Sequence, residues 1–451
     1  MTQVIVLGIA FINIFMLFTG INALSRHLVP MLPKVLRIFS SALISLAMVS
    51  FLYFLMLVLN QGLMFILILL SCINLFHLHW THPELKSLFN YKTPIIDQSE
   101  ILVPLVAVLL MAIFLIFRGS KYGDYDAWAI WNVHAKYLYY PHIWTHVFND
   151  STAMSHSDYP LMLPSLVAFF WGTINNTSFV IPLLLSFIIL ITIAILLYFA
   201  LIEAFQSKIY GCFALFLLIA DHNFQSLNTA QCADSWLSLF ILLTFVLNNQ
   251  LKRINSSNLA YFLAFICASC TWIKNEGDLF YLVFTTVFII SNYKRGPVIT
   301  KYLIGSILPL IVTICFKVFF APANDLVAAS DNQMSRQIGD LKDVSRYNII
   351  FKTYATTLLD RFLPAVILVL SLLLVNRNFF KSFAFIVIFI LFSGFTLIYL
   401  TTPYDLGWHL YTSLWRLLYQ IYPSLLYISI IAYGNVLSKK PNIDPKEAFG
   451  K

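Results

Sequence analysis

Residues 101–132 read ILVPLVAVLLMAIFLIFRGSKYGDYDAWAIWN and join an apolar run to a short segment with two carboxylates and two tryptophans. The run at 101–117 carries no charged residue, and its length approaches the roughly 20 helical residues that cross a hydrocarbon core. Trp and Tyr are enriched where a membrane meets water. The stretch therefore predicts a membrane-spanning helix that ends at a polar segment on the membrane surface.

Similar apolar runs recur along the whole chain. Hydrophobic residues make up 60% of the 451 residues and charged residues 11%, and the mean hydropathy is +0.82. This composition excludes a soluble globular protein. Unpaired backbone groups are costly inside a bilayer, so such a chain crosses it as helices. We expect an all-α fold, a polytopic membrane helical bundle of about thirteen transmembrane helices, with juxtamembrane helices in a large first extracytoplasmic loop.

The formal net charge of +8 does not indicate a nucleic-acid partner. In a soluble domain such a charge would favour nucleic acid, but here the Lys and Arg residues are scattered among short loops between apolar runs. Basic residues in short loops orient the spans, because cytoplasmic loops carry more of them. We therefore expect the membrane as a partner, and no nucleic acid.

The same basic residues predict which side each loop faces. The loops at 26–37 and at 86–92 are basic and are predicted to be cytoplasmic. If the short run at 161–172 enters the membrane only halfway, four later basic pairs face the cytoplasm as well: Lys252/Arg253, Lys294/Arg295, Arg377/Lys381 and Lys439/Lys440. With that choice the polar segments all face the non-cytoplasmic side, where we expect a cavity at the outer edge of the bilayer. These segments are 122–132, 156–164, 228–236, 272–278 and 404–416.

This orientation divides the chain into three parts. Residues 1–100 form N-terminal transmembrane helices to which the sequence assigns no role. Residues 101–437 form a transmembrane catalytic module with extracytoplasmic loops at 118–177 and 320–361, and residues 438–451 form a cytoplasmic tail. The loop at 320–361 is the longest polar stretch. It suits a lid or acceptor-binding loop, and a passive connector equally well.

Asp124 and Asp126 precede a predicted amphipathic surface helix that includes Trp128 and Trp131. A helix N-terminus uses one acid as a cap, which leaves the other for chemistry. We favour Asp126 as a general base, with Asp124 as the second catalytic candidate. The sequence DYD also resembles a metal-binding DxD motif, so a divalent metal held by Asp124 and Asp126 stays open. No other cofactor is indicated.

Two further motifs place acids on the same predicted side. His156 and Asp158 precede a Pro-containing amphipathic run, which would lay a turn against the rim of the cavity, and a solvated turn is the alternative. Asp234 opens a predicted span, where it suits either a helix cap or a substrate contact.

The sequence WIKNEGD carries Lys274, Glu276 and Asp278 between two apolar runs with almost no loop. Charges at membrane depth are functional candidates by default. Lys274 either pairs with one of these acids or offers its charge to an anionic ligand. We place Glu276 and Asp278 at the predicted cavity.

His409 and Arg416 are seven residues apart in GWHLYTSLWRLLYQIYP, so a helix would place them on one face. Arg416 could be an anchor whose charge reaches the membrane surface. Alternatively it recognises phosphate, for which the planar guanidinium group is well shaped. We favour phosphate recognition, with His409 as a further candidate.

The order of these motifs resembles the GT-C membrane glycosyltransferases, such as the protein O-mannosyltransferases and the aminoarabinose transferase of lipid A. The resemblance covers roughly 101–437, from DYDAWAIWNVHAKYL through HSDYPLMLPSLVAFFWG to CADSWLSLF, KNEG and WHLYTSLWRLLYQIYP. It implies that Asp126 is the catalytic base and that Asp158 and His156 line the acceptor side. It also implies that Arg416 and Lys274 hold a lipid phosphate. Three spans precede the unit, where the family usually has one.

The expected reaction is inverting transfer of a sugar from a polyprenyl-phosphate donor to an acceptor hydroxyl of a glycan, lipid or protein. We expect it at the outer face of a membrane, with a bacterial inner membrane and a site that faces the periplasm as the favoured location. A polymerase or ligase that uses a lipid-diphosphate donor is the nearest alternative. A transporter is less favoured, because the sequence shows no inverted repeat.

Overall fold

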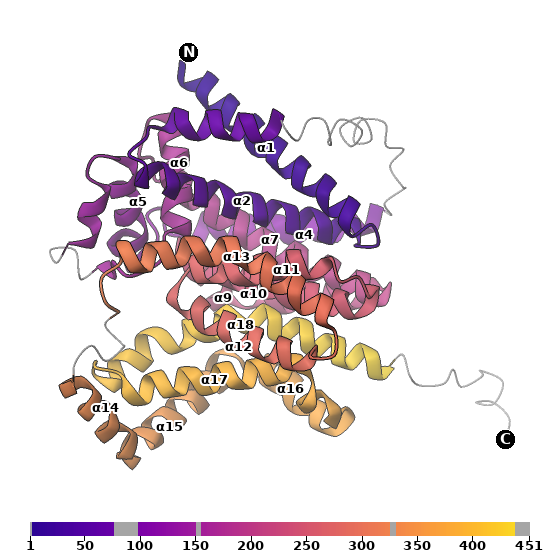
Figure 1. Ribbon diagram of the computed structural model, residues 1–451. Helices are drawn as coiled ribbons and strands as arrows, with labels where there is room; N and C mark the ends of the chain where they lie inside the picture. Colours follow the sequence, from indigo (N-terminus) through magenta and orange to yellow (C-terminus); the bar gives the residue numbers. More distant parts are fainter. Residues whose placement is uncertain (1, 76–97, 150–154, 325–330, 438–451) are drawn as a thin grey trace, which may run out of the picture.

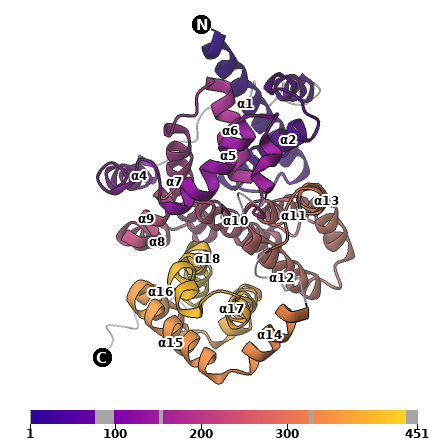
Figure 2. The same ribbon diagram turned by 90° about the vertical axis from the view of Figure 1, so that its left-hand side faces the viewer.

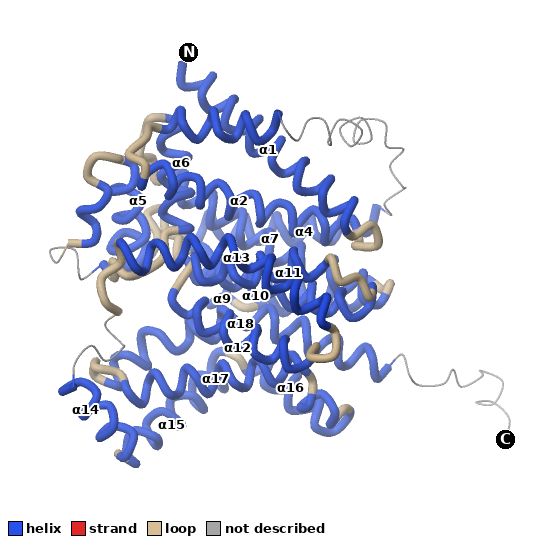
Figure 3. The backbone as a smooth tube through the Cα atoms, in the orientation of Figure 1, coloured by secondary structure: helices blue, strands red, loops and turns tan. Residues whose placement is uncertain are grey.

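The computed structural model is a bundle of helices (Figure 1). The described residues are 2–75, 98–149, 155–324 and 331–437. Helices make up 85% of the structure, and the described part of the chain contains no strand (Figure 3). This outcome confirms the all-α prediction, since helices satisfy their own backbone groups where water is excluded. The predicted tail at 438–451 lies outside the described residues.

The longer helices form the body of the bundle. In chain order they are α1 (Thr2–Leu28), α2 (Lys34–Val58), α4 (Gln98–Arg118), α7 (Val180–Phe205), α10 (Ala233–Ile254), α12 (Asn275–Ser291), α13 (Gly296–Phe319), α15 (Val344–Arg361), α17 (Phe383–Thr401) and α18 (Leu406–Leu437). Shorter helical segments connect or flank them. They are Leu63–Leu75, η1 (Ala127–Trp131), α5 (Asn132–Tyr139), η2 (Trp144–Phe148), α6 (Met162–Ile174), α8 (Lys208–Ala220), α9 (His222–Thr229), α11 (Leu259–Ser269), η4 (Cys270–Trp272), α14 (Asp331–Lys342), α16 (Leu363–Val375) and η5 (Arg377–Lys381).

Helix length and composition mark an integral membrane protein. Among the described residues seven helices are long and apolar enough to cross a membrane, or nine if each of two bent pairs counts as one span. The pairs are α9 with α10, bent by 113°, and α15 with α16, bent by 103°. The helices α4 and α13 leave many large apolar side chains exposed, as lipid-facing helices do. The expected count of about thirteen spans is not confirmed.

Helix α10 lies inside the bundle and packs against α18, α7 and α11. Figure 2 shows α14, α15, α16 and α17 on one side of it and α1, α2, α5 and α6 on the other. Every side chain of α10 from Ala233 to Asn248 is buried. Because this part of α10 has no face toward lipid or water, a charged residue in its first turn must find its partners within the protein.

Helix α6 corresponds to the short run that the sequence analysis placed halfway into the membrane. Its 13 residues span about 20 Å at 1.5 Å per residue, less than a hydrocarbon core of about 30 Å. It packs against α1, α2, α5 and α7. The helices α1 and α2, from the part of the chain before residue 101, therefore belong to the same bundle as α6.

The two predicted polar loops are largely helical. The segment 118–177 contains η1, α5, η2 and α6, and the segment 320–361 contains α14 and α15. The helices α5 and α14 lie at the same end of the bundle, opposite the end where α18 stops at Leu437 (Figure 1). Polar segments far apart in the sequence therefore share one end of the molecule. Which side of a membrane this end faces stays a prediction.

Candidate active site

The central contact of the site joins α18 to the segment before η1. Arg416 donates through one terminal nitrogen to Asp126 at 2.5 Å and through the other to Asp234 at 2.6 Å. The side chain of Asp126 is 24% exposed, whereas that of Asp234 is fully buried. One guanidinium group therefore ties a partly exposed carboxylate to a carboxylate inside the bundle.

A tight turn holds the two acids of DYD against the break between α9 and α10. Gly123 has φ +74°, and a Cβ atom there would lie 2.7 Å from the carbonyl oxygen of Ala230, so only glycine fits without strain. The N–H of Asp124 donates to that same oxygen at 3.2 Å. The side-chain amide of Gln231 donates to the carbonyl of Lys121 at 3.1 Å. The turn is thus fixed at both its ends.

The 113° bend between α9 and α10 lets α10 begin inside the bundle with Asp234 in its first turn. This carboxylate accepts hydrogen bonds from Lys274 at 3.0 Å and from Gln420 at 2.6 Å, in addition to Arg416. It also faces the positive end of the helix dipole. These donors replace the lost hydration of the buried charge, and removing one partner of such a pair costs about 3–5 kcal/mol.

Lys274 has extended backbone between η4 and α12 and is 4% exposed. Its ammonium group lies 2.8 Å from Glu276 and 3.0 Å from Asp234. The start of α12 approaches η4 closely because Gly277 has no side chain, and a Cβ atom there would lie 1.9 Å from the carbonyl oxygen of Cys270. The glycine of KNEG thus allows the backbone contact that places the lysine.

These contacts form one charge network, which consists of Asp126, Arg416, Asp234, Lys274 and Glu276. Its three carboxylates and two cations sum to a formal charge of −1, from 2 − 3. Both cations are already paired. A phosphate group that reaches this network must therefore compete with a carboxylate for its cation.

A second polar group surrounds Asp158. Its carboxylate accepts from the amides of Asn275 and Asn324, each at 2.6 Å. Lys317 donates to the backbone carbonyl of Asp158 at 2.8 Å and also to the side chain of Asn275. Asp278 lies within electrostatic reach of Lys317. Asn275 directly follows the buried lysine of the charge network, so the two groups are neighbours.

Aromatic rings pack beside both groups. The ring of Tyr159 stacks on Trp131 at a centroid distance of 5.4 Å and on His156 at 5.2 Å. The Nζ atom of Lys274 lies 5.8 Å from the same ring centroid. Burial raises the pKa of the Tyr159 hydroxyl well above its usual value, so the hydroxyl stays protonated. His156 thus supports this stack of rings.

Asp124 differs from Asp126 in its environment. Burial raises the pKa of Asp124 above its usual value, Arg416 opposes the rise, and the neighbouring Asp126 adds to it. A carboxylate with a raised pKa is a stronger base. The turn therefore presents one carboxylate held by an arginine and, two residues earlier, a second one whose pKa is raised by burial.

His409 lies on the same helix as Arg416 but contacts a different part of the structure. Its Nδ1 atom lies 2.8 Å from the hydroxyl of Thr402, and its ring centroid lies 5.0 Å from that of Tyr399. These partners belong to the end of α17 and the turn before α18. A role for His409 in phosphate binding stays a prediction.

The described residues contain no group of three or more His, Cys, Asp and Glu side chains that is arranged to hold a metal ion. Asp124 and Asp126 supply two carboxylates near the Arg416 guanidinium. A divalent metal at these two acids stays a prediction.

Sequence reasoning did not identify three of the polar residues that complete these groups. Lys317 is the single charge near the end of the apolar run ILPLIVTICFKVFF, a position that marks a functional candidate by itself. Gln420 follows Arg416 by one helical turn, so it could have been placed on the same face. Asn324 carries no comparable signal in the sequence.

Comparisons with known proteins do not assign a family. No family model, no curated protein and no solved structure matches the chain. The resemblance to the GT-C glycosyltransferases therefore stays a proposal, and the functional argument rests on the site.

Proposed function

We propose that the protein is a membrane glycosyltransferase of the GT-C kind, which moves a sugar from a polyprenyl-phosphate donor to an acceptor hydroxyl. The observation that carries this proposal is the bridge of Arg416 between Asp126 and Asp234. It sets a candidate base beside a candidate phosphate ligand in an integral membrane protein. A donor with a lipid tail reaches such a site from within the bilayer.

In the proposed reaction Asp126 takes the proton of the acceptor hydroxyl. The hydroxyl oxygen forms a bond to the anomeric carbon of the sugar while the bond between that carbon and the phosphate oxygen breaks. The electron pair of the broken bond leaves with the phosphate, whose negative charge increases, and the configuration at the anomeric carbon is inverted. Asp124 lies close enough to Asp126 for the two carboxylates to interact electrostatically.

The leaving phosphate needs positive charge more than it needs a proton donor. Arg416 offers a planar fork of N–H groups that matches phosphate oxygens. In the proposed cycle the donor phosphate replaces Asp126 at Arg416, while Asp234 continues to hold the other side of the guanidinium group. Lys274 adds a second positive charge behind Asp234. Loss of one such donor slows comparable reactions about 100-fold.

The group around Asp158 is the proposed acceptor side. The Asp158 carboxylate can accept from sugar hydroxyls, and the amides of Asn275 and Asn324 beside it can donate to them. Glu276 belongs to the charge network through its pair with Lys274, and Asp278 lies within electrostatic reach of Lys317 in the group around Asp158. In this proposal His156 lines the acceptor side as well, and its ring stacks on that of Tyr159.

We further propose that the bundle has about thirteen spans and that the end with α5 and α14 faces the exterior. A bacterial inner membrane with the site on the periplasmic side is the proposed location. The basic residues near 253 and 295 support this orientation, because they gather at the other ends of α10 and α12.

The test is an assay of donor cleavage with purified protein in lipid nanodiscs. A panel of polyprenyl-phosphate hexoses and pentoses is supplied with a membrane extract as the source of acceptors, and released polyprenyl phosphate is measured. We expect turnover with at least one donor, a loss of about 100-fold in Arg416→Lys and a loss at least as large in Asp126→Asn. Asp340→Asn is the matched control, since Asp340 pairs with Arg346 at 3.5 Å outside the charge network.

Other outcomes discriminate the alternatives. Cleavage of lipid-diphosphate sugars only would favour a glycan polymerase or ligase. Proton or ion flux across liposomes without cleavage of any donor would favour a transporter. Full activity in purified Asp126→Asn would remove this carboxylate from the mechanism.

A further inference from the structure

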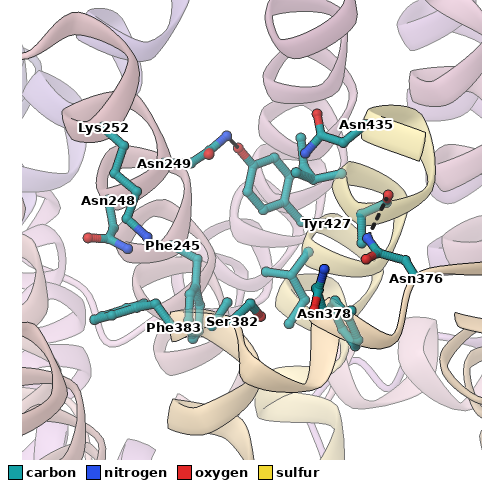
Figure 4. Close-up of a pocket in the computed structure, with 15 residues that line it drawn as sticks. Phe245, Asn248, Asn249, Lys252, Asn376, Asn378, Ser382, Phe383, Tyr427 and Asn435 are labelled. Atoms are coloured by element: carbon teal, nitrogen blue, oxygen red, sulfur yellow. Dashed lines mark hydrogen bonds between the residues drawn. The ribbon is translucent and has the colours of Figure 1, made fainter. Parts of the chain in front are cut away.

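A pocket of about 400 Å³ lies at the far end of α10 and α18 from the charge network. Figure 4 shows the residues that line it. The last turns of α10 and α18, the segment η5 and the start of α17 line it. Along α10, about 27 Å separate Asp234 from Lys252 at 1.5 Å per residue. That distance is close to the thickness of a hydrocarbon core. The pocket and the charge network therefore occupy opposite ends of the same two helices.

The pocket wall combines side-chain amides, one cation and apolar side chains. The amides are those of Asn248, Asn249, Asn376, Asn378 and Asn435. Lys252 is the cation, and the described lining contains no carboxylate. Phe245 and Ile428 are among the apolar side chains of the wall. Such a volume and such a mixture of polar and apolar groups are typical of a small-ligand site.

Asn248 lines the pocket beside Asn249. It is 5% exposed, and its amide forms no hydrogen bond with any residue that the structure describes. The neighbouring Asn249, by contrast, donates to the hydroxyl of Tyr427 at 3.0 Å. Neither amide atom of Asn248 is among the enclosed side-chain atoms without a partner, so the amide reaches the open pocket that the residue lines. The amide of Asn248 is therefore placed to form hydrogen bonds with a ligand in the pocket.

Lys252 supplies positive charge at the same wall. Its Nζ atom lies 5.0 Å from the ring centroid of Phe383, and it forms no ion pair with a described residue. Figure 4 shows its side chain beside Asn248. A cation without a neighbouring carboxylate attracts an anion, whereas amides both donate to and accept from hydroxyl groups.

We propose that this pocket binds an anionic membrane phospholipid whose headgroup carries free hydroxyl groups, as in phosphatidylglycerol. The single charge of a phosphodiester matches the single lysine, and the headgroup hydroxyls match the amides. The apolar wall suits the glycerol backbone and the first carbons of the acyl chains. The position of the pocket near the ends of long apolar helices is the depth at which headgroups lie. This inference does not depend on the proposed transferase activity.

The test measures the melting temperature of the purified full-length protein in detergent, by its tryptophan fluorescence, while phospholipid is added. We expect a saturable rise with phosphatidylglycerol and none with phosphatidylcholine. Lys252→Met should weaken the affinity about tenfold, in line with the loss of a charged hydrogen bond. Asn248→Leu should abolish the rise, because it removes an amide that would hydrogen-bond the headgroup hydroxyls.

Lys294→Met is the matched control, since Lys294 lies 5.4 Å from the Tyr293 ring centroid and is outside the pocket lining. It should leave the response to phosphatidylglycerol unchanged. An equal response to both lipids, or an unaltered response in Lys252→Met and Asn248→Leu, would overturn the proposal. The same is true if soluble glycerophosphoglycerol, which has no acyl chains, reproduces the full rise, because the ligand would then be a free phosphoester.

Discussion

The contribution of the ion pair between Asp234 and Lys274 to the free energy of unfolding follows from how deeply the pair is buried. The Asp234 side chain is fully buried and that of Lys274 is 5% exposed, with 3.0 Å between the charged atoms. Removing one partner of a buried pair costs about 3–5 kcal/mol, because the remaining charge stays out of water. Each charge here keeps a second partner, Arg416 or Glu276. We therefore expect Asp234→Asn and Lys274→Met each to lower the free energy of unfolding by about 3 kcal/mol.

The double variant should cost less than the sum of the two single variants. If the effects were independent, the sum would be about 6 kcal/mol. Removing both charges leaves neither side chain as an unpaired ion, so we expect a total of about 4 kcal/mol and a coupling free energy of about 2 kcal/mol. The result depends on direct contact between the two side chains at the break before α10.

Unfolding in mixtures of SDS and a mild detergent, followed by tryptophan fluorescence, measures these free energies. The pair of Arg336 with Asp340 is the control cycle, because its atoms are 3.9 Å apart and the arginine side chain is 41% exposed. Its coupling should stay below about 1 kcal/mol. Additive effects of Asp234→Asn and Lys274→Met, to within about 0.5 kcal/mol, would refute the contact.

Two further predictions concern the segments around the network. Gly123→Ala should destabilise the protein by at least about 1 kcal/mol, because φ +74° is unfavourable for alanine and its Cβ would lie 2.7 Å from a carbonyl oxygen. The control is Gly339→Ala, which should be neutral or stabilising, because an added Cβ at this open helical position meets no neighbouring atom within 4 Å. Thermal melts of both variants measure the difference. Burial lowers the pKa of His134 from 6.5 to about 4, so the folded state binds fewer protons than the unfolded state between these values. Stability should fall by up to about 3 kcal/mol from pH 6.5 to pH 4, and His134→Gln should flatten that part of a melting-temperature profile; an equal slope in both proteins would contradict the assignment.

The class of fold was predictable because it follows from composition. Long apolar runs can satisfy their backbone groups in a membrane only as helices, so the bundle needed no detail of packing. The two bent pairs were not predictable in the same way. At the 113° bend before α10 the turn at Gly123 packs against Ala230, which is a contact between segments more than a hundred residues apart.

The membership of the charge network was easier to predict than its pairing. Asp126, Asp234, Lys274 and Arg416 were each notable because a charge in an apolar chain is costly without a partner. The sequence could not choose among partners, since every carboxylate had several cations within reach of some plausible packing. The contact of Arg416 with both acids depends on the geometry of α10 and α18, which cross in the core.

The pairing of Arg416 with Asp126 leads to a prediction that separates binding from catalysis in the proposed reaction. A lipid phosphate must displace Asp126 from the guanidinium group, so the carboxylate that acts as base also opposes binding of the donor. Asp126→Asn should therefore bind polyprenyl phosphate, the unreactive product, more tightly than the parent protein does. The contact is partly exposed and worth up to about 1 kcal/mol, which corresponds to an increase in affinity of up to about fivefold.

Binding of fluorescent polyprenyl phosphate to protein in nanodiscs measures this difference, and transfer activity is measured in parallel. Asp340→Asn again serves as the control and should change neither quantity. Tighter binding together with lost activity is the signature of a base that competes with the phosphate for one arginine. Weaker binding in Asp126→Asn would mean that the carboxylate helps to hold the lipid, for example through a metal ion. That result would refute the proposal that the lipid phosphate displaces Asp126 from Arg416.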